Sequence, residues 1–246
     1  MTPLRIAMWS GPRNISTALM RSWGNRPDTF VSDEPLYAHY LAATGIDHPG
    51  ADEVVAHHEP NWQKAVAGLI GEIPDGKSIY YQKHMAHHLL PDIGREWLGH
   101  LTHAFLIRDP REMLLSLAKV LPNPGPEATG LPQQVEIFEW ARAHGRAVPP
   151  VVDARDILEN PRALLTRLCQ TLGVDFRDEM LSWSPGRRAT DGIWAKHWYE
   201  NVEKSTSFQP YRAREEALPE HLRPVLAECQ PYYDLLHGRR LRPDPS

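Results

Sequence analysis

A run of polar residues near the start of the chain has the composition of an anion-binding loop. It contains a basic residue and two hydroxyl groups, in the order Gly11-Pro12-Arg13-Asn14-Ile15-Ser16-Thr17. If the run leads from a strand into a helix, backbone N–H groups and the positive end of the helix dipole meet the Arg13 side chain there. Such a point suits a phosphate or sulfate. An ordinary strand-to-helix turn, with a helix that begins at Ser or Thr, is the alternative.

A second candidate pair is Arg108 and Ser116, which stand eight residues apart in IRDPREMLLSL. The apolar run before Arg108 predicts a strand, and Pro110 with the apolar stripe after it predicts a helix. Arg108 would then end the strand and Ser116 would lie two turns into the helix, so both side chains can reach one anion. The alternative is a surface turn with a solvent-facing serine.

The elements that position these residues alternate between strand and helix. The pattern predicts strands at 6–9, 29–32, 78–81, 102–107 and 149–153, and helices at 15–23, 62–70, 110–120, 133–144 and 162–172. This predicts an α/β fold with three layers, α/β/α, around a mostly parallel sheet of about five strands. Residues 44–60 and 122–132 are predicted loops, the first with one helical turn and the role of a lid. Helices near 219–229 and 232–236 are predicted to end the chain.

The segment from Ser182 to Tyr211 interleaves aromatic and basic residues, among them Arg187, Arg188, Trp194 and Lys196. Such a segment could cover a nucleotide. The alternative is an irregular segment whose aromatic rings pack on the core.

These stretches resemble the sulfotransferases that use 3′-phosphoadenosine 5′-phosphosulfate (PAPS). Pro12, Arg13, Ser16 and Thr17 are similar to that family's 5′-phosphosulfate loop, whereas the patterns GxxxxGK[ST] and GxGxxG are absent. Arg108 and Ser116 resemble the family's motif for the 3′-phosphate. The resemblance spans about residues 4–208 and implies a P-loop-type nucleotide-binding fold, PAPS as co-substrate and a small-molecule acceptor.

Two later stretches resemble the same family. Asp153–Pro161, followed by Leu172-Gly173-Val174, is similar to its YEDL segment and the helix ending in LGV. Arg187, Arg188 and Trp194 resemble its late segment that closes over the nucleotide, although no Gly follows the basic pair directly. The resemblance implies that these three residues bind the cofactor.

The family comparison implies two candidate bases. Sulfuryl transfer needs a base for the acceptor's proton and positive charge for the leaving oxygen, and it needs no metal. The run from Gln82 to Pro91 resembles the family's KTHLP segment, with His84 at the position of the base and Lys83 one place beyond the family's lysine. Glu34 resembles the glutamate that other sulfotransferases use. We favour Glu34 slightly because its match is not shifted. His84 and Lys83 would then orient the acceptor or stabilise the leaving oxygen.

His84, His87 and His88 share the spacing i, i+3, i+4 and could form a metal cluster, but their flanks lack the Glu of HExxH, so we predict no metal site.

Two other functions stay open. One is a phosphotransferase with a P-loop-type fold that uses Arg13 and Arg108 as a clamp. The other is a non-catalytic nucleotide-binding relative.

Composition sets the remaining expectations. The chain has 246 residues, 41% hydrophobic and 24% charged, with a net charge of −4. We expect one domain over residues 1–246, with a core at about 4–175 and a closing segment with the last helices at about 180–240.

The net charge predicts no nucleic-acid partner, and no apolar run approaches the roughly 20 residues that span a bilayer. With two cysteines and a first strand that begins by Leu4, we expect a cytoplasmic protein without stable membrane insertion. The oligomeric state is not predicted.

Overall fold

The computed structural model describes residues 3–145 and 147–242. Five strands form one sheet in which every pair is parallel. The order across the sheet is β2-β3-β1-β4-β5, with bounds β1 Leu4–Ser10, β2 Thr29–Asp33, β3 Ile79–Met85, β4 Thr102–Ile107 and β5 Val151–Asp153. This confirms the predicted α/β fold with its parallel sheet. Strand β3 continues through the run 82–85 that was expected to follow it.

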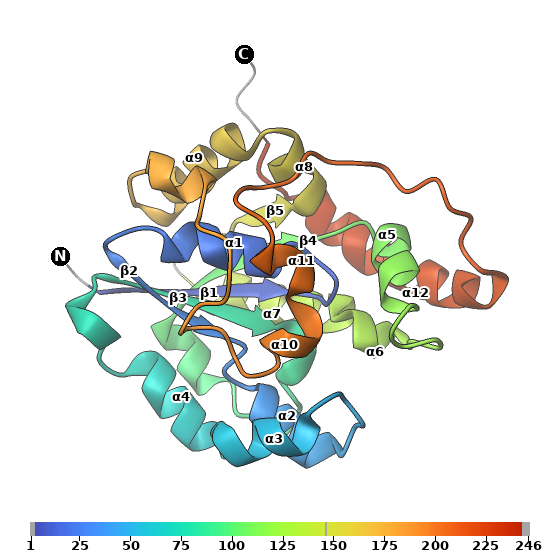
Figure 1. Cartoon of the computed structure of the whole chain (residues 1–246), viewed down its shortest axis with the longest axis horizontal. Coiled ribbons are helices and arrows are strands. Elements are labelled where there is room, and N and C mark those ends of the chain that lie inside the picture. The colour runs from blue at the N-terminus through green and yellow to red at the C-terminus, as the bar shows by residue number, and fades with distance from the viewer. Residues whose placement is uncertain (1–2, 146, 243–246) are drawn as a thin grey trace.

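Helices cover both faces of the sheet, as the apolar strands require (Figure 1). Along β1, Ile6 and Met8 point to one face and Ala7 and Trp9 to the other, because successive side chains of a strand alternate. The first face is covered by α1 (Ser16–Gly24), α8 (Ala154–Glu159) and α9 (Pro161–Leu172). The second is covered by α4 (Trp62–Ile70), α7 (Leu131–His144) and α12 (Arg223–His237).

Shorter helices follow the strands and build the surroundings of the site. They are α2 (Tyr37–Thr44), α3 (Ala51–His57), α5 (Pro110–Leu117), α6 (Pro126–Thr129), α10 (Ala195–Trp198) and α11 (Glu200–Glu203). A separate apolar cluster packs Tyr37 and Leu41 of α2 and Val54 of α3 against Trp194 and Tyr199. The late segment of the chain is therefore packed against the helices that follow β2.

Three predicted elements differ from the structure. Residues 44–60 contain helix α3 of seven residues rather than one turn, because Val54 is buried against α2 and the late segment. Residues 122–132 contain α6 and the first residues of α7. The two predicted C-terminal helices are one helix, α12, which continues through Pro231. Proline usually ends a helix, but Cys229, Tyr233 and Leu236 are buried on both sides of it and hold one helical face on the sheet.

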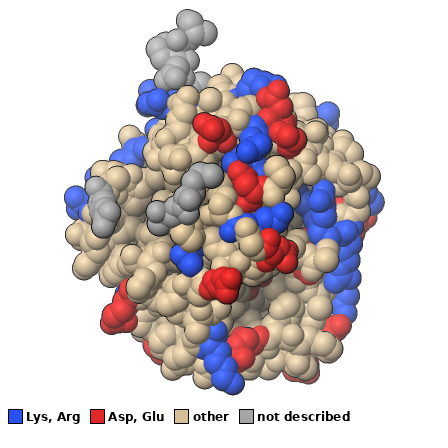
Figure 2. All heavy atoms as spheres, turned by 90° about the vertical axis from the view of Figure 1, so that its left-hand side faces the viewer, with Lys and Arg blue, Asp and Glu red and all other residues tan. Residues whose placement is uncertain are grey.

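Charges are mixed on the face at the left-hand side of Figure 1, where basic and acidic side chains alternate (Figure 2). Within residues 3–145 and 147–242, none of the helices combines the length and the apolar composition needed to cross a membrane.

Candidate functional site

The loops that follow β1, β2, β3 and β4 meet at the carboxyl edge of the sheet, where parallel α/β sheets bind ligands. Two groups of side chains lie there. The arginine cluster consists of Arg13, Arg108, Ser116 and Arg214. The carboxylate cluster consists of Asp33, Glu34, Lys83, His88 and Tyr199.

The loop between β1 and α1 is held tightly in place. A side chain at position 11 would place its Cβ 2.2 Å from the Thr129 carbonyl oxygen, so only glycine fits there. Asn14 donates from Nδ2 to the Leu106 carbonyl at 3.1 Å and accepts from the Ile15 N–H at 2.8 Å. No side chain caps the N terminus of α1, which begins at Ser16. Its first N–H groups therefore remain available to an anion.

Arg13 links this loop to α5. Its backbone has a φ of +53°, a conformation that costs free energy for any residue except glycine. Its Nε donates to Ser116 Oγ at 3.0 Å, and its carbonyl accepts from Arg108 Nη1 at 2.7 Å. Burial and the charges of Arg108 and Arg214 lower the pKa of Arg13. Three guanidinium groups thus converge where an anion would relieve their repulsion.

A carboxylate partly balances this cluster. Arg108 donates to Glu112 Oε2 from Nε at 3.2 Å and from Nη2 at 3.0 Å, and Tyr211 donates to Glu112 Oε1 at 2.5 Å. Beside the pair lies a cavity of about 350 Å³, lined among others by Asp153 and Arg155. Cavities of this size accommodate small ligands.

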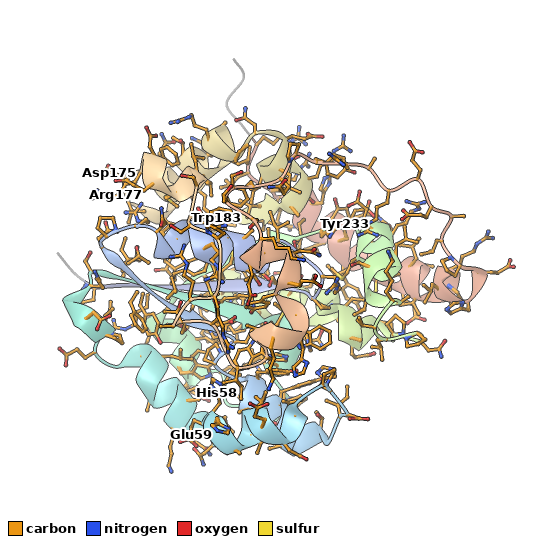
Figure 3. The ribbon with its side chains drawn as sticks, viewed as in Figure 1. His58, Glu59, Asp175, Arg177, Trp183 and Tyr233 are labelled. Atoms are coloured by element: carbon orange, nitrogen blue, oxygen red, sulfur yellow. The ribbon has the colours of Figure 1, made fainter. Side chains whose placement is uncertain are left out.

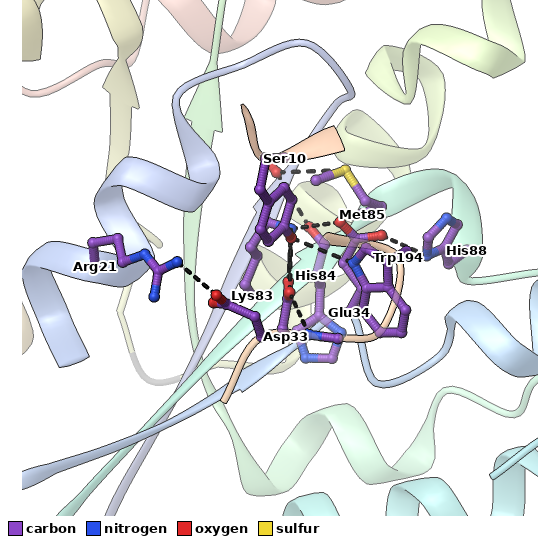
Figure 4. Close-up of polar contacts among 12 residues, drawn as sticks. Ser10, Arg21, Asp33, Glu34, Lys83, His84, Met85, His88 and Trp194 are labelled. Carbon is purple, nitrogen blue, oxygen red and sulfur yellow. Dashed lines mark hydrogen bonds and ion pairs between the residues drawn. The ribbon is translucent and has the colours of Figure 1, made fainter. Parts of the chain in front are cut away.

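The carboxylate cluster is almost completely buried. Figure 4 draws the contacts among Asp33, Glu34, Lys83 and His88. Lys83 Nζ donates to Asp33 Oδ1 at 2.8 Å, to Glu34 Oε1 at 2.5 Å and to the Tyr199 hydroxyl at 2.9 Å. Asp33 also accepts from the Gly192 N–H at 3.2 Å and from Tyr199. Burial opposes the charge of Lys83, but the two carboxylates outweigh it and hold the lysine's pKa well above its ordinary value.

Glu34 is the member of this cluster that remains partly accessible. Its backbone has a φ of +43°, and its N–H donates to the Lys83 carbonyl at 2.9 Å. Burial raises the pKa of Glu34, with a further contribution from Asp33, although Lys83 acts in the opposite direction. Among the described residues other than glycine, only Arg13, Glu34 and Asp75 have positive φ. Two of these three strained residues therefore lie in the site, Arg13 in the loop after β1 and Glu34 directly after β2.

His88 is the histidine nearest to Glu34. Its ring is stacked between Tyr37, with centroids 4.8 Å apart, and Tyr40, with centroids 4.6 Å apart. His88 Nδ1 lies 3.9 Å from Glu34 Oε2. Burial lowers the pKa of His88 well below its ordinary value, so the ring is neutral.

A comparison with protein families identifies the family of the chain. A model described as "Sulfotransferase domain" matches residues 4–240. The chain is a member of the sulfotransferase domain family.

Two curated relatives come from Arabidopsis thaliana. They are branched-chain-amino-acid aminotransferase-like protein 2, 36% identical over 94% of this chain, and branched-chain-amino-acid aminotransferase-like protein 1, 37% identical over 96%. The sulfotransferase domain described here spans only 41% and 42% of their lengths.

Solved structures share the fold at low sequence identity. The sulfotransferase domain of the Synechococcus PCC 7002 olefin synthase has a TM-score of 0.53 and 17% identity, over 92% of this chain and 94% of that one. A sulfotransferase from Alicyclobacillus acidocaldarius has a TM-score of 0.56 and 13% identity, over 98% of each chain.

In this chain, the fold does not place His84 beside Glu34. Lys83 and His84 are consecutive in β3, so their side chains leave opposite faces of the sheet. The His84 ring stacks on Trp9 with centroids 4.3 Å apart and contacts Gln82 Oε1 at 3.2 Å. It is 1% exposed, and burial lowers its pKa to about 3. These contacts are those of a core histidine.

The three predicted cofactor-binding residues of the late segment, Arg187, Arg188 and Trp194, lie away from the arginine cluster. The Arg188 N–H donates to Asp191 Oδ2 at 2.8 Å, and Asp191 pairs with Arg21 of α1 at 2.6 Å. Arg187 is exposed. Trp194 is buried and donates to the Tyr199 hydroxyl at 3.4 Å. Its ring centroid lies 4.8 Å from that of His58, the residue that follows α3 (Figure 3). None of the contacts described for these three residues joins them to Arg13, Arg108 or Ser116.

The end of this segment at Tyr211 and the residues that follow it, up to Arg214, approach the arginine cluster instead. Arg111 Nη1 donates to the Arg214 carbonyl at 2.9 Å, and Tyr211 is bonded to Glu112. Sequence reasoning missed Arg214 and His88. Arg214 carries only the weak signal of a basic residue in a polar run, whereas His88 stands four residues after the predicted His84 and belongs to the same family-like stretch.

No group of three or more His, Cys, Asp and Glu side chains in the described part of the chain is arranged to hold a metal ion. His87 and His88 pack against each other with ring centroids 4.4 Å apart, while His84 lies against Trp9.

Proposed function

We propose that this protein transfers a sulfuryl group from PAPS to a hydroxyl or amine of a small-molecule acceptor. The observation that supports this most directly is the position of the two clusters. A cationic cluster with an uncapped helix N terminus and a buried carboxylate with a raised pKa stand at the same edge of one sheet. The first can bind phosphate groups, and the second can accept a proton.

The arginine cluster fits the nucleotide. Arg108, Ser116 and Arg214 would hold the 3′-phosphate, and Arg13 stands between that group and the loop at residues 11–17. The N–H groups at the start of α1, with the hydroxyls of Ser16 and Thr17, would hold the 5′-phosphosulfate. PAPS supplies the sulfuryl group on a phosphate leaving group. The protein's own task is to bind both phosphate groups and to keep the acceptor oxygen in line with them.

Glu34 is the proposed base. Its raised pKa keeps it a stronger proton acceptor than an ordinary glutamate, and its Oε2 is not engaged by Lys83. An ammonium group has three donors, and Lys83 uses them on Asp33, Glu34 and Tyr199. We therefore assign Lys83 to positioning Glu34 rather than to the leaving oxygen. His84 has no role in proton transfer in this proposal.

The test is a pair of measurements on the purified protein in a metal chelator. Adenosine 3′,5′-bisphosphate at 100 times its dissociation constant should stabilise the fold by about 2.7 kcal/mol in a thermal-shift titration. PAPS with a panel of phenols, alcohols and amines should then give bisphosphate product. In a parallel titration without the chelator, strong stabilisation by ATP with Mg²⁺ but not by the bisphosphate would replace this proposal with a phosphotransferase. Bisphosphate binding without any turnover would indicate the non-catalytic relative.

A further inference from the structure

His88 and Glu34 face each other without a hydrogen bond between them. His88 Nδ1 is 3.9 Å from Glu34 Oε2, which is too long for a direct bond. Nδ1 is buried, and no hydrogen-bond partner for it lies among the residues that the structure describes. The His88 side chain is 3% exposed and that of Glu34 is 10% exposed. A buried ring nitrogen without a partner costs free energy unless a ligand supplies one.

The separation fits one bridging oxygen atom. An oxygen at the usual hydrogen-bond length of about 2.8 Å from both atoms forms a triangle with an apex of about 90° on the 3.9 Å base. A hydroxyl oxygen can donate one hydrogen bond and accept another at nearly that angle. The pair is therefore spaced for a hydroxyl and not for a methyl group.

Both atoms are held in place by their neighbours. Lys83 fixes the other carboxylate oxygen of Glu34 at 2.5 Å. Tyr37 and Tyr40 hold the His88 ring between them, with interplanar angles of 9° and 29°. These contacts oppose rotation of either group, so the gap is a property of the folded site.

We propose that His88 directly contacts the acceptor, donating a hydrogen bond from Nδ1–H to the hydroxyl oxygen whose proton passes to Glu34 Oε2. This inference rests on the proposed function. In the transfer, the acceptor oxygen forms a bond to sulfur and its proton moves to Glu34. The bond from sulfur to the bridging phosphate oxygen breaks, and that oxygen keeps the electron pair. His88 remains neutral throughout and changes no bond. The site therefore selects an acceptor whose nucleophile can accept a hydrogen bond while it donates a proton, as a hydroxyl does and an ammonium group does not.

His87 provides a matched control for His88. Both belong to the same short turn, Ala86–His88, both pack against Tyr40, and both have a buried Nδ1 without a partner. Only His88 faces Glu34. Asparagine carries an amide N–H near the position of histidine Nδ1, so His88→Asn keeps the donor whereas His88→Ala removes it.

The first measurement needs no acceptor. ¹⁵N NMR of histidine-labelled protein, with His88→Asn used for assignment, reads the tautomer of the ring. We expect the neutral Nδ1–H form. A neutral Nε2–H form would leave Nδ1 without a proton and would overturn the proposal.

The second measurement uses phenol, whose hydroxyl stays protonated at neutral pH, as the probe acceptor with PAPS. His88→Ala should lower kcat/KM about tenfold, mainly by raising the KM for the phenol, and His88→Asn should recover to within about threefold of wild type. The same two changes at His87 should stay within about twofold, and bisphosphate affinity should not change. Equal effects at both positions, or a loss of kcat/KM in His88→Asn as large as in His88→Ala, would overturn the assignment. If wild type transfers a sulfuryl group to no member of the acceptor panel, the proposed function fails and the role of His88 fails with it. If wild type is active but the tautomer or the variants differ from these expectations, only the role of His88 fails.

Discussion

The two clusters at the sheet edge differ in how their charges are compensated. In the arginine cluster, Arg108 is paired with Glu112 at 3.0 Å and Arg214 lies 4.0 Å from Glu216, while Arg13 has no carboxylate partner among the described residues. The side chains of Arg108 and Arg214 keep 19% and 25% exposure. In the carboxylate cluster, Lys83 is matched by two carboxylates and lies 1% exposed. Excess positive charge near solvent attracts a dianion, whereas buried and nearly balanced charge shifts pKa values.

The difference indicates that the two clusters at this edge of the sheet have different functions, one in binding and one in proton transfer. Binding of phosphate groups requires charge that is not already neutralised, and proton transfer requires a base whose pKa has been raised by burial. The β1–α1 loop connects the two, because Arg13 reaches Ser116 while the strand before it pairs with β3, which carries Lys83. Mutations in the two clusters should therefore have separable effects on binding and on turnover.

The largest effect is expected at Glu34. Glu34→Gln keeps the size and the backbone conformation but removes the base, so turnover should fall by about 10²–10⁴. Bisphosphate affinity should stay near the wild-type value. Steady-state kinetics and a binding titration measure the two quantities, with the exposed Glu72→Gln as control. Loss of nucleotide binding together with turnover would contradict the separation of the clusters.

The pH dependence of kcat/KM should show the same base. Burial and the charge of Asp33 raise the pKa of Glu34 against the opposing charge of Lys83, while neighbouring His88 stays neutral. Because only the ionised carboxylate accepts a proton, kcat/KM should fall about tenfold per pH unit below that raised pKa. The midpoint of this acidic limb of the pH profile should lie above the ordinary glutamate pKa of about 4.3. The acidic limb should be absent from the residual activity of Glu34→Gln, and an acidic limb that persists in this variant would belong to another group.

Arg108→Ala should act on the other cluster. Loss of a charged hydrogen bond of about 1.5–3 kcal/mol predicts roughly 10- to 150-fold weaker bisphosphate binding and poorer discrimination against nucleotides without a 3′-phosphate. Isothermal titration with both nucleotides measures this. Since Arg108→Ala also leaves the buried Glu112 without its partner, the double variant Arg108→Ala/Glu112→Gln separates charge imbalance from lost contact. Full 3′-phosphate preference in both variants would remove Arg108 from the site.

Ser116→Ala should give the smallest change. A neutral hydrogen bond contributes about 0.5–1.5 kcal/mol, so binding should weaken by about 2- to 13-fold. The same titration should show turnover at saturating nucleotide close to wild type. Thr171→Ala, on the exposed side of α9, is a suitable control. A loss larger than that of Arg108→Ala would indicate that Ser116 supports the loop through Arg13 rather than the ligand.

The sequence by itself determined the fold class and the position of the strands. Apolar runs bounded by Gly, Pro and polar residues mark β1 and β4, and the apolar spacing after each marks a helix, because burial of a strand or a helix face leaves a local pattern. The same local patterns marked Glu34 and Arg108, which stand directly after strands. Parallel strands bring such residues to one edge whatever the details of packing.

Only the tertiary structure decided which neighbours each candidate has. The choice between Lys83 and His84 depends on which face of β3 each side chain leaves, and a strand whose two faces are both buried gives no alternation to read. The short helix α3 and the unbroken α12 exist because distant residues bury their apolar faces. Likewise, the approach of Arg214 to Arg13 and of His88 to Glu34 joins segments far apart in the chain, and no spacing of residues encodes such a distance.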